Sequence, residues 1–288
     1  MSQRKAKQVR QQMRAQAPPG AKKSTKRRRP GIAAGHSVWA WAVVALAAAA
    51  VVVGALAVVG RGGGSVKSAG TFHSKGGPLS SSAGDASRAL GAIQRVSDAP
   101  LVEAGKPVVF FMGGQFCPFC AADRWAFVKA TSRFGTWTNL RSLQSQGGVD
   151  GFASLPTYNL AGARYRSDLI SLRHKEVADV SGNKLESLDS LENGLVNSYD
   201  PGGSIPFTVA GGSGGQYTVG LAFSPGLLKG QSFDKLRQAL ATGVRNPTVK
   251  AIDAEGDAIT ALLCKLTGGK PAAVCSAASI TALQNQLS

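Results

Sequence analysis

The longest hydrophobic run in the chain extends over Val38–Gly60 and contains no charged side chain. A helix needs roughly 20 apolar residues to cross the hydrocarbon core of a bilayer, and this run of about 23 is long enough. Trp39 and Trp41 lie at its N-terminal end, and amphipathic rings prefer the headgroup region. A cleavable signal peptide is the alternative, but its apolar region would be shorter, about 7–15 residues. The pattern therefore predicts an uncleaved transmembrane helix.

The composition changes after this run. Residues 61–87 are rich in Gly and Ser, and such a stretch buries too little apolar surface to fold by itself. About 200 residues follow, which is enough for one domain with a sizeable core. We therefore expect a tail at 1–37, a transmembrane helix at 38–60, a linker at 61–87 and a globular domain at 88–288.

Within the globular domain, the pattern over residues 106–135 predicts a strand followed at once by a helix. Lys106–Met112 consists mainly of β-branched and aromatic residues, as expected of a strand buried on both faces. Ala121, Trp125 and Val128 then recur at helical spacing, and Asp123 falls on the opposite face. Asp123 and Arg124 therefore either belong to a solvated face of the helix or, within a turn of Cys120, shift the pKa of that thiol.

The rest of the domain continues to alternate between strand and helix patterns. Residues 169–177 predict a strand, and a leucine stripe over 184–199 predicts a helix. Residues 204–210 and 216–222 flank a Gly-rich turn and predict an antiparallel hairpin. Helical spacing returns over 232–242 and 248–266. The sequence thus predicts an α/β domain.

Charge orients the predicted transmembrane helix. Residues 1–37 contain eleven Lys and Arg and no acidic residue, so most of the formal net charge of +17 belongs to the tail. Positive flanks stay on the cytoplasmic side. We expect a single-pass protein of the cell membrane, with a cytoplasmic N-terminus that contacts anionic lipid and an extracytoplasmic C-terminal domain. Nucleic acid is not predicted as a partner, because the tail lacks interleaved aromatic residues and adjoins the apolar run.

Two of the four cysteines, Cys117 and Cys120, form a Cys-x-x-Cys motif between the predicted strand and helix. This arrangement places Cys117 at a helix N-terminus, where backbone N–H groups and the helix dipole favour the thiolate. A thiolate is the species that attacks disulfides. Pro118 suits the first helical turn, where its missing N–H is not needed. The motif points to thiol–disulfide exchange in an oxidising compartment, with a structural disulfide as the alternative.

The other two cysteines, Cys264 and Cys275, bracket a Thr-Gly-Gly-Lys-Pro turn. They predict a structural disulfide that closes a short loop, with a second redox relay as the alternative. A zinc site shared by all four cysteines is disfavoured, because ten residues separate this second pair where zinc ligands are usually two to four apart. No metal site is predicted.

The order of these elements resembles the thioredoxin fold: a strand, Cys-x-x-Cys on a helix, and much later an Ile-Pro that opens a hairpin before a closing helix. The resemblance implies that Cys117 is the nucleophile and Cys120 the resolving thiol. It also implies that Ile205 and Pro206 position the substrate, since a cis proline lies beside the redox pair in that superfamily. Residues 140–200 would be an insertion. Phe116 before the motif and the Pro-Phe inside it depart from thioredoxin proper and lean towards oxidases or isomerases of the Dsb type.

Three blocks of sequence carry a narrower resemblance, over residues 88–285. They are Gly113-Gly-Gln-Phe-Cys-Pro-Phe-Cys-Ala-Ala-Asp-Arg-Trp125, Ser132-Arg-Phe-Gly-Thr136 and the segment from Cys264 to Cys275. They are similar to domain-of-unknown-function family 929, whose members are prokaryotic and often membrane-anchored. This resemblance supports the extent of the domain and implies no activity.

These patterns together predict a membrane-tethered thiol–disulfide oxidoreductase with a thioredoxin-like domain. Its partners would be extracytoplasmic protein thiols or disulfides and a further redox partner, and the direction of electron flow stays open. No cofactor is needed, because the cysteine pair carries the two electrons. The alternative is a non-catalytic binding module of the cell envelope in which Cys117–Cys120 is a structural disulfide.

Overall fold

The computed structural model describes residues 81–287. The predicted tail and transmembrane helix and most of the predicted linker lie outside these residues. Among the residues that the structure does describe, no helix is both long and apolar enough to cross a membrane. The first described helix, α3 (Ala83–Leu90), includes residues that the composition assigned to the linker. Its small buried residues, Ala86 and Ala89, allow it to pack closely against the rest of the domain.

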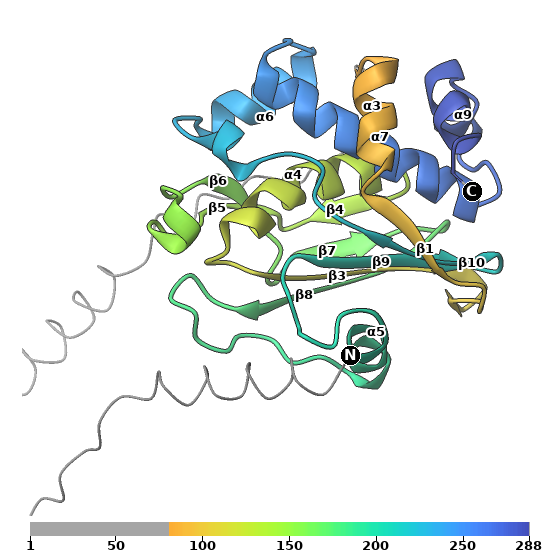
Figure 1. Cartoon of the computed structure of the whole chain (residues 1–288), viewed down its shortest axis with the longest axis horizontal. Helices are drawn as coiled ribbons and strands as arrows, with labels where there is room; N and C mark the ends of the chain where they lie inside the picture. Colours follow the sequence, from red (N-terminus) through yellow and green to blue (C-terminus); the bar gives the residue numbers. More distant parts are fainter. Residues whose placement is uncertain (1–80, 288) are drawn as a thin grey trace, which may run out of the picture. The chain divides into compact units, whose positions relative to one another are not determined.

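Helices and strands alternate along the described chain (Figure 1). After α3, the helices are α4 (Pro118–Thr131), α5 (Ser190–Tyr199), α6 (Phe233–Thr242), α7 (Pro247–Leu266), α8 (Ala272–Cys275) and α9 (Ala278–Gln284). Short 3-10 turns are η1 (Val149–Gly151) and η2 (Pro225–Leu228). The strands are β1 (Ile93–Ser97), β2 (Val102–Glu103), β3 (Lys106–Gly114), β4 (Thr136–Thr138), β5 (Arg141–Gln144), β6 (Pro156–Asn159), β7 (Arg164–Arg166), β8 (Ser171–Ala178), β9 (Phe207–Gly212) and β10 (Gly215–Val219).

The main sheet has six strands, in the order β1-β10-β9-β3-β2, with β8 also paired to β3. Strand β8 is parallel to β3, whereas β9 and β10 form the predicted antiparallel hairpin and β9 runs antiparallel to β3. Side chains of β3 alternate between two hydrophobic clusters: Val109 and Phe111 belong to one and Val108 and Phe110 to the other. The prediction of a strand buried on both faces is therefore confirmed.

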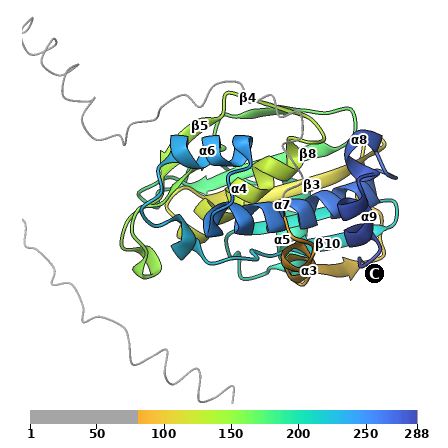
Figure 2. The same cartoon turned by 90° about the horizontal axis from the view of Figure 1, so that it is seen from above.

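Helices cover both faces of this sheet. Helices α3, α4, α6, α7 and α9 lie on one face and α5 lies on the other (Figure 1). The view onto the larger helical layer shows α4 and α7 lying side by side across the sheet (Figure 2). The larger hydrophobic cluster fills the space between this layer and the sheet. The helix that carries the Cys-x-x-Cys motif is thus an interior element.

Helix α5 is shorter than the leucine stripe predicts. It begins at Ser190 instead of Lys184, because Asp189 and Glu192 form a capping box that fixes its N-terminus. The preceding residues run back along the end of β8, where the N–H of Leu185 donates to the carbonyl of Val177. Leu185 is exposed as a result.

The segment between α4 and β8 contains two small strand pairs, β4–β7 and β5–β6. Strand β6 packs directly on α4: the indole N–H of Trp125 donates to the carbonyl of Pro156, at 2.9 Å, and the hydroxyl of Thr157 donates to the carbonyl of Ala121, at 2.8 Å. The ring of Trp125 also packs at a tilt against that of Tyr158. This part of the predicted insertion is therefore integral to the core.

Helices α4 and α7 share a row of buried ion pairs. Lys129 of α4 pairs with Asp253 of α7. Arg133, two residues after the last residue of α4, pairs with Asp257 one turn further along α7, with 2.8 Å between Arg133 Nη2 and Asp257 Oδ1. The expectation of a solvated face on α4 is wrong, because Asp123 is buried as well. Most of the helix is buried, and Asp123 and Lys129 face charged side chains of α7 instead of water.

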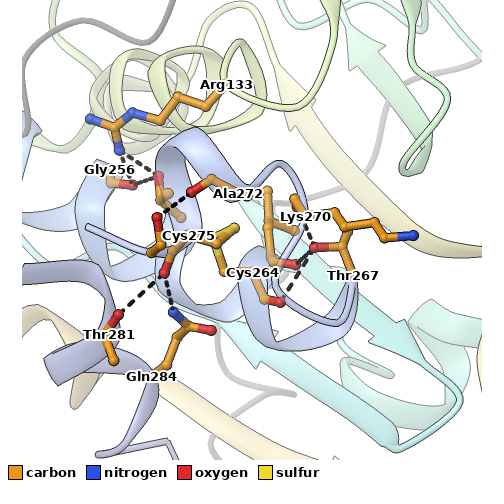
Figure 3. The surroundings of a disulfide bond; sticks show 12 residues. Arg133, Gly256, Cys264, Thr267, Lys270, Ala272, Cys275, Thr281 and Gln284 are labelled. Atoms are coloured by element: carbon orange, nitrogen blue, oxygen red, sulfur yellow. Dashed lines mark hydrogen bonds between the residues drawn. A yellow bond between two sulfur atoms is a disulfide. The ribbon is translucent and has the colours of Figure 1, made fainter. Parts of the chain in front are cut away.

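Cys264 and Cys275 are joined by a disulfide that links the end of α7 to α8 (Figure 3). Both cysteines are buried. The carbonyl of Cys275 accepts hydrogen bonds from Thr281 and Gln284, and the Thr267 hydroxyl donates to the carbonyl of Lys270. The disulfide thus fastens the C-terminal helices to α7.

Candidate active site at Cys117 and Cys120

The Cys-x-x-Cys motif begins where β3 leaves the sheet. Cys117 is the N-cap of α4, and its sulfur accepts a hydrogen bond from the N–H of Cys120, at 3.4 Å. Pro118 occupies the first helical turn, as predicted. A Cβ at Gly114 would lie 2.8 Å from Ile205 Cδ1, so a glycine lets Ile205 approach the motif closely.

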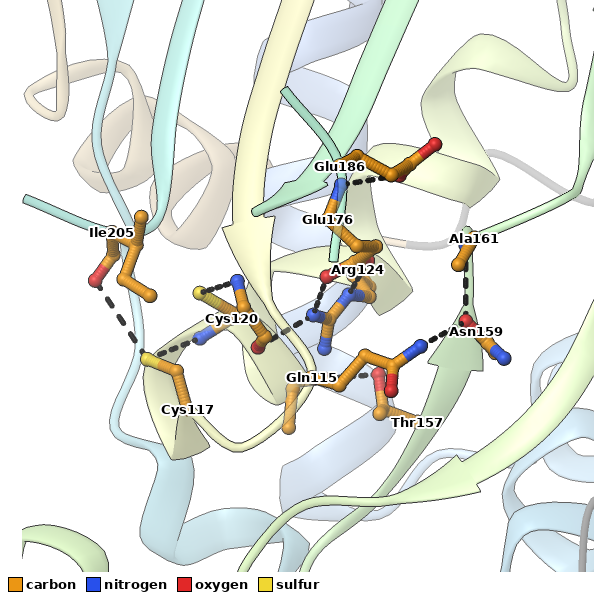
Figure 4. Close-up of polar contacts among 12 residues, drawn as sticks. Gln115, Cys117, Cys120, Arg124, Thr157, Asn159, Ala161, Glu176, Glu186 and Ile205 are labelled. Atoms are coloured by element: carbon orange, nitrogen blue, oxygen red, sulfur yellow. Dashed lines mark hydrogen bonds and ion pairs between the residues drawn. The ribbon is translucent and has the colours of Figure 1, made fainter. Parts of the chain in front are cut away.

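The two sulfurs differ in access. Both cysteines are unpaired thiols; Cys117 is 4% exposed and Cys120 is fully buried. The Cys117 thiol faces the carbonyl of Ile205, at 3.7 Å, and the N–H of Gly114 donates to the Cys120 sulfur, at 3.5 Å (Figure 4). The Ile205–Pro206 peptide bond is cis. The four residues that the sequence singled out here therefore lie together.

The two thiols also differ in acidity. Hydrogen bonding from the Cys120 thiol lowers the pKa of Cys117 to about 7, against the opposing effect of burial, with backbone N–H groups and Arg124 adding to the decrease. Burial, together with the hydrogen bond to Cys117, raises the pKa of Cys120 well above its usual value. The sulfur with some exposure is thus the one that ionises first.

A buried ion pair, which the sequence analysis did not predict, lies next to the motif. Arg124, one turn after Cys120 on α4, binds both oxygens of Glu176 on β8, through Nε at 2.7 Å and Nη2 at 2.6 Å. Neither side chain is exposed. The sequence placed Arg124 near Cys120, but nothing in the alternation of β8 indicated that Glu176 faces inward.

The buried carboxyl group of Asp123 lies next to another buried carboxyl group, that of Glu255 on α7. Burial raises the pKa of Asp123 to about 6, although its hydrogen bond with Glu255 and the charge of Arg124 oppose this. Burial and the charge of Asp123 raise the pKa of Glu255 well above its usual range. The N–H of Ala222 donates to Glu255 Oε2, at 2.6 Å. The two carboxyl groups therefore retain protons at pH values where isolated ones have lost them.

Substituting Asn for Asp123 should make the stability of the chain less dependent on pH. A carboxyl whose pKa is raised on folding stabilises the fold below its unfolded pKa, and that contribution is lost as the pH rises through the folded pKa. For Asp123 the loss runs from about pH 4 to beyond about pH 6. Denaturant unfolding near pH 8 should show Asp123→Asn more stable than wild type, by roughly 2 kcal/mol.

The reciprocal variant Glu255→Gln is the control. If the carboxyl groups act as a pair, either substitution should flatten the profile, and combining them should add little, since coupled sites are not additive. Stability curves that run parallel to wild type at every pH would contradict the raised pKa values of Asp123 and Glu255.

The other cysteine pair takes no part in this site. Cys264 and Cys275 are bonded to each other, so their sulfurs are not ligands for a metal at Cys117 and Cys120. Within residues 81–287, no cluster of three or more His, Cys, Asp or Glu side chains could hold a metal ion. The site is built from two thiols, one buried ion pair and the backbone of Gly114 and Ile205.

Comparison with known proteins gives one family. Residues 92–197 match the family described as Domain of unknown function (DUF929), a range that contains the Cys-x-x-Cys motif, Arg124 and Glu176. No curated protein matches the chain, and no solved structure does.

Proposed function

Given that residues 92–197 match the family described as Domain of unknown function (DUF929), we propose that the chain is a membrane-tethered thiol–disulfide oxidoreductase acting on extracytoplasmic proteins. One observation carries the proposal: of two adjacent thiols at the start of α4, the one with some exposure has a pKa lowered to about 7, and the buried one has a raised pKa. A structural disulfide does not require this asymmetry, whereas a nucleophile and a resolving thiol do.

The reaction needs only sulfur chemistry. The Cys117 thiolate attacks one sulfur of a substrate disulfide, so that a bond from Cys117 to the substrate forms and the other substrate sulfur leaves as a thiolate. Cys120 then loses its proton and attacks Cys117. The Cys117–Cys120 disulfide forms, and the second substrate sulfur leaves. Two electrons pass to the substrate, and a dithiol of a partner protein returns them. The same steps in reverse oxidise a substrate dithiol.

We also propose that the domain is thioredoxin-like, with an insertion that lies within residues 140–200. The central strand β3, its parallel neighbour β8, its antiparallel neighbour β9 and the motif at the start of α4 support this reading. Ile205 and Pro206 would position the substrate backbone, because the carbonyl of Ile205 already lies within reach of the attacking sulfur. Membrane attachment rests on the predicted helix at 38–60, which lies outside the described residues.

The acidity of Cys117 bears on the direction of electron flow. Nucleophile pKa values in Cys-x-x-Cys proteins range from about 3.5 in DsbA to about 7 in thioredoxin, and the lower values accompany stronger oxidants. A pKa of about 7 puts Cys117 at the thioredoxin end. We therefore expect a reduction potential between about −270 and −180 mV, the range of reductants and isomerases.

The test is the reduction potential of the Cys117–Cys120 pair in the full chain, kept in detergent and equilibrated in glutathione buffers of graded composition. The expected value lies in the range above, together with catalysis of disulfide exchange in a reduced, unfolded reporter such as ribonuclease A. The alternative, a non-catalytic binding module with an inert disulfide, predicts a potential well below about −300 mV and no rate enhancement. That pair of results would refute the proposal.

A further inference from the structure

The Arg124–Glu176 ion pair is connected to the cysteines through the backbone. Besides binding Glu176, Nη2 of Arg124 donates to the carbonyl of Gly114, at 2.8 Å (Figure 4). Gly114 is the residue whose N–H points at the Cys120 sulfur. The pairing of β3 with β8 shifts register between Gly113 and Gly114, directly beside Glu176. Arg124 therefore holds the irregular end of β3 in the conformation that places an N–H on the resolving sulfur.

Among the described residues, few charged side chains lie near the sulfurs of Cys117 and Cys120. Arg124 comes from α4 and Glu176 from β8, and the carboxylate of Glu186 accepts the N–H of Glu176, at 2.7 Å. The positive charge of Arg124 lowers the pKa of both cysteines, whereas burial dominates at Cys120. Burial also raises the pKa of Glu176, against the stabilising charge of Arg124. In this arrangement the guanidinium is the charge that reaches the sulfurs, and the carboxylate of Glu176 balances it.

A purely structural role accounts poorly for this pair. Buried ion pairs contribute little net stability compared with apolar side chains of similar volume, because both charges lose their hydration. The chain already contains comparable buried pairs remote from the motif, such as Arg133, just after α4, with Asp257 of α7. Of the buried ion pairs among residues 81–287, the Arg124–Glu176 pair is the one that contacts Gly114, whose N–H donates to the Cys120 sulfur.

We propose that Arg124 and Glu176 are positioning residues that set the redox balance of the Cys117–Cys120 pair. Arg124 stabilises the thiolate and hence the reduced form, and Glu176 limits that stabilisation. The inference rests on the proposed function and deepens it, since it assigns the direction of electron flow to two named side chains. A chain that lost Glu176 would be a stronger oxidant, and a chain that lost Arg124 a stronger reductant.

The experiment compares Glu176→Gln with Arg124→Gln in the full chain, by following the ultraviolet absorbance of the Cys117 thiolate against pH and by measuring the reduction potential. Glu176→Gln leaves the guanidinium unbalanced, so the pKa of Cys117 should fall by roughly one unit and the equilibrium should shift about tenfold towards the dithiol, or about 30 mV. Arg124→Gln should shift both quantities in the opposite direction. Arg124→Lys keeps the charge and should restore most of the acidity.

Arg133→Met and Asp257→Asn are matched controls, because they break a buried ion pair between the segment that follows α4 and helix α7. They should lower stability without moving the pKa of Cys117. Shifts of the same sign in Glu176→Gln and Arg124→Gln, or no shift beyond that of the controls, would overturn the inference. If Arg124→Gln does not fold, the sign of the Glu176→Gln shift alone decides. The titration needs no substrate, so it tests this inference separately from the proposed function. If the two variants shift the pKa of Cys117 in opposite directions but the chain has no exchange activity, the proposed function is refuted and the roles of Arg124 and Glu176 are supported.

Discussion

Replacing Cys117 with Ser should abolish disulfide exchange, by roughly a thousandfold or more, because the hydroxyl is a poor nucleophile towards sulfur and Cys120 is too deeply buried to substitute for it. Replacing Cys120 with Ser should have a different effect. The first step would still occur, but the mixed disulfide between Cys117 and the substrate would have no resolving thiol and would accumulate. Non-reducing electrophoresis followed by mass spectrometry detects that adduct and the cysteine that carries it.

The control for both variants is the double substitution Cys264→Ser with Cys275→Ser. It removes the other cysteines, which lie in the α7–α8 disulfide, and should lower stability while leaving exchange and trapping intact. The proposed roles would be excluded by a Cys117→Ser chain that still exchanges disulfides, or by adducts that form on Cys120 in wild type.

Replacing Trp125 with Ala should cause the largest loss of stability among single changes near the site. Its indole is fully buried between Tyr158 and Phe233, at ring separations of 4.7 and 5.1 Å. Truncation removes this packing, leaves a cavity behind α4 and leaves the carbonyl of Pro156 without its donor. The expected decrease in the free energy of unfolding is about 3–5 kcal/mol. In a domain of this size, each kcal/mol lowers Tm by about 2–4 °C.

The variant Trp125→Phe separates packing from hydrogen bonding. It keeps an aromatic ring against Tyr158 and loses the indole N–H, so its loss should be well under half that of Trp125→Ala. Thermal unfolding followed by circular dichroism measures both. If Trp125→Ala cost less than about 1 kcal/mol, the β5–β6 pair would not be part of the core and would be a peripheral addition.

The elements around the motif could be predicted because local signals there agree with the fold. β-branched and aromatic residues predict β3 between two cores, and a Gly-rich turn predicts the β9–β10 hairpin. A cysteine followed by proline at a helix start predicts the cap on α4. Such signals act within a few residues, so the sequence alone carries them. The resemblance to thioredoxins added Ile205 and Pro206, which are far from the motif in sequence.

Features that depend on distant partners could not be predicted in the same way. Asp123 and Arg124 look like residues of a solvated face, because a helical wheel carries no information about what covers the helix. Glu255 and Glu176, which face them, lie more than 50 positions away in the sequence. The start of α5 was missed for a related reason: the leucine stripe continues through residues that instead extend along β8.

The ion pairs between α4 and α7 have a consequence for how the two helices align. Apolar contacts alone tolerate sliding, because one turn of a helix presents side chains much like those of the next. Lys129 and Arg133 stand four residues apart, as do their partners Asp253 and Asp257. If α7 slipped by one turn in either direction, one pair would re-form, and one cation and one carboxylate would be buried alone, at a cost of several kcal/mol. The two ion pairs thus favour a single alignment of α7 with the helix that carries the cysteines.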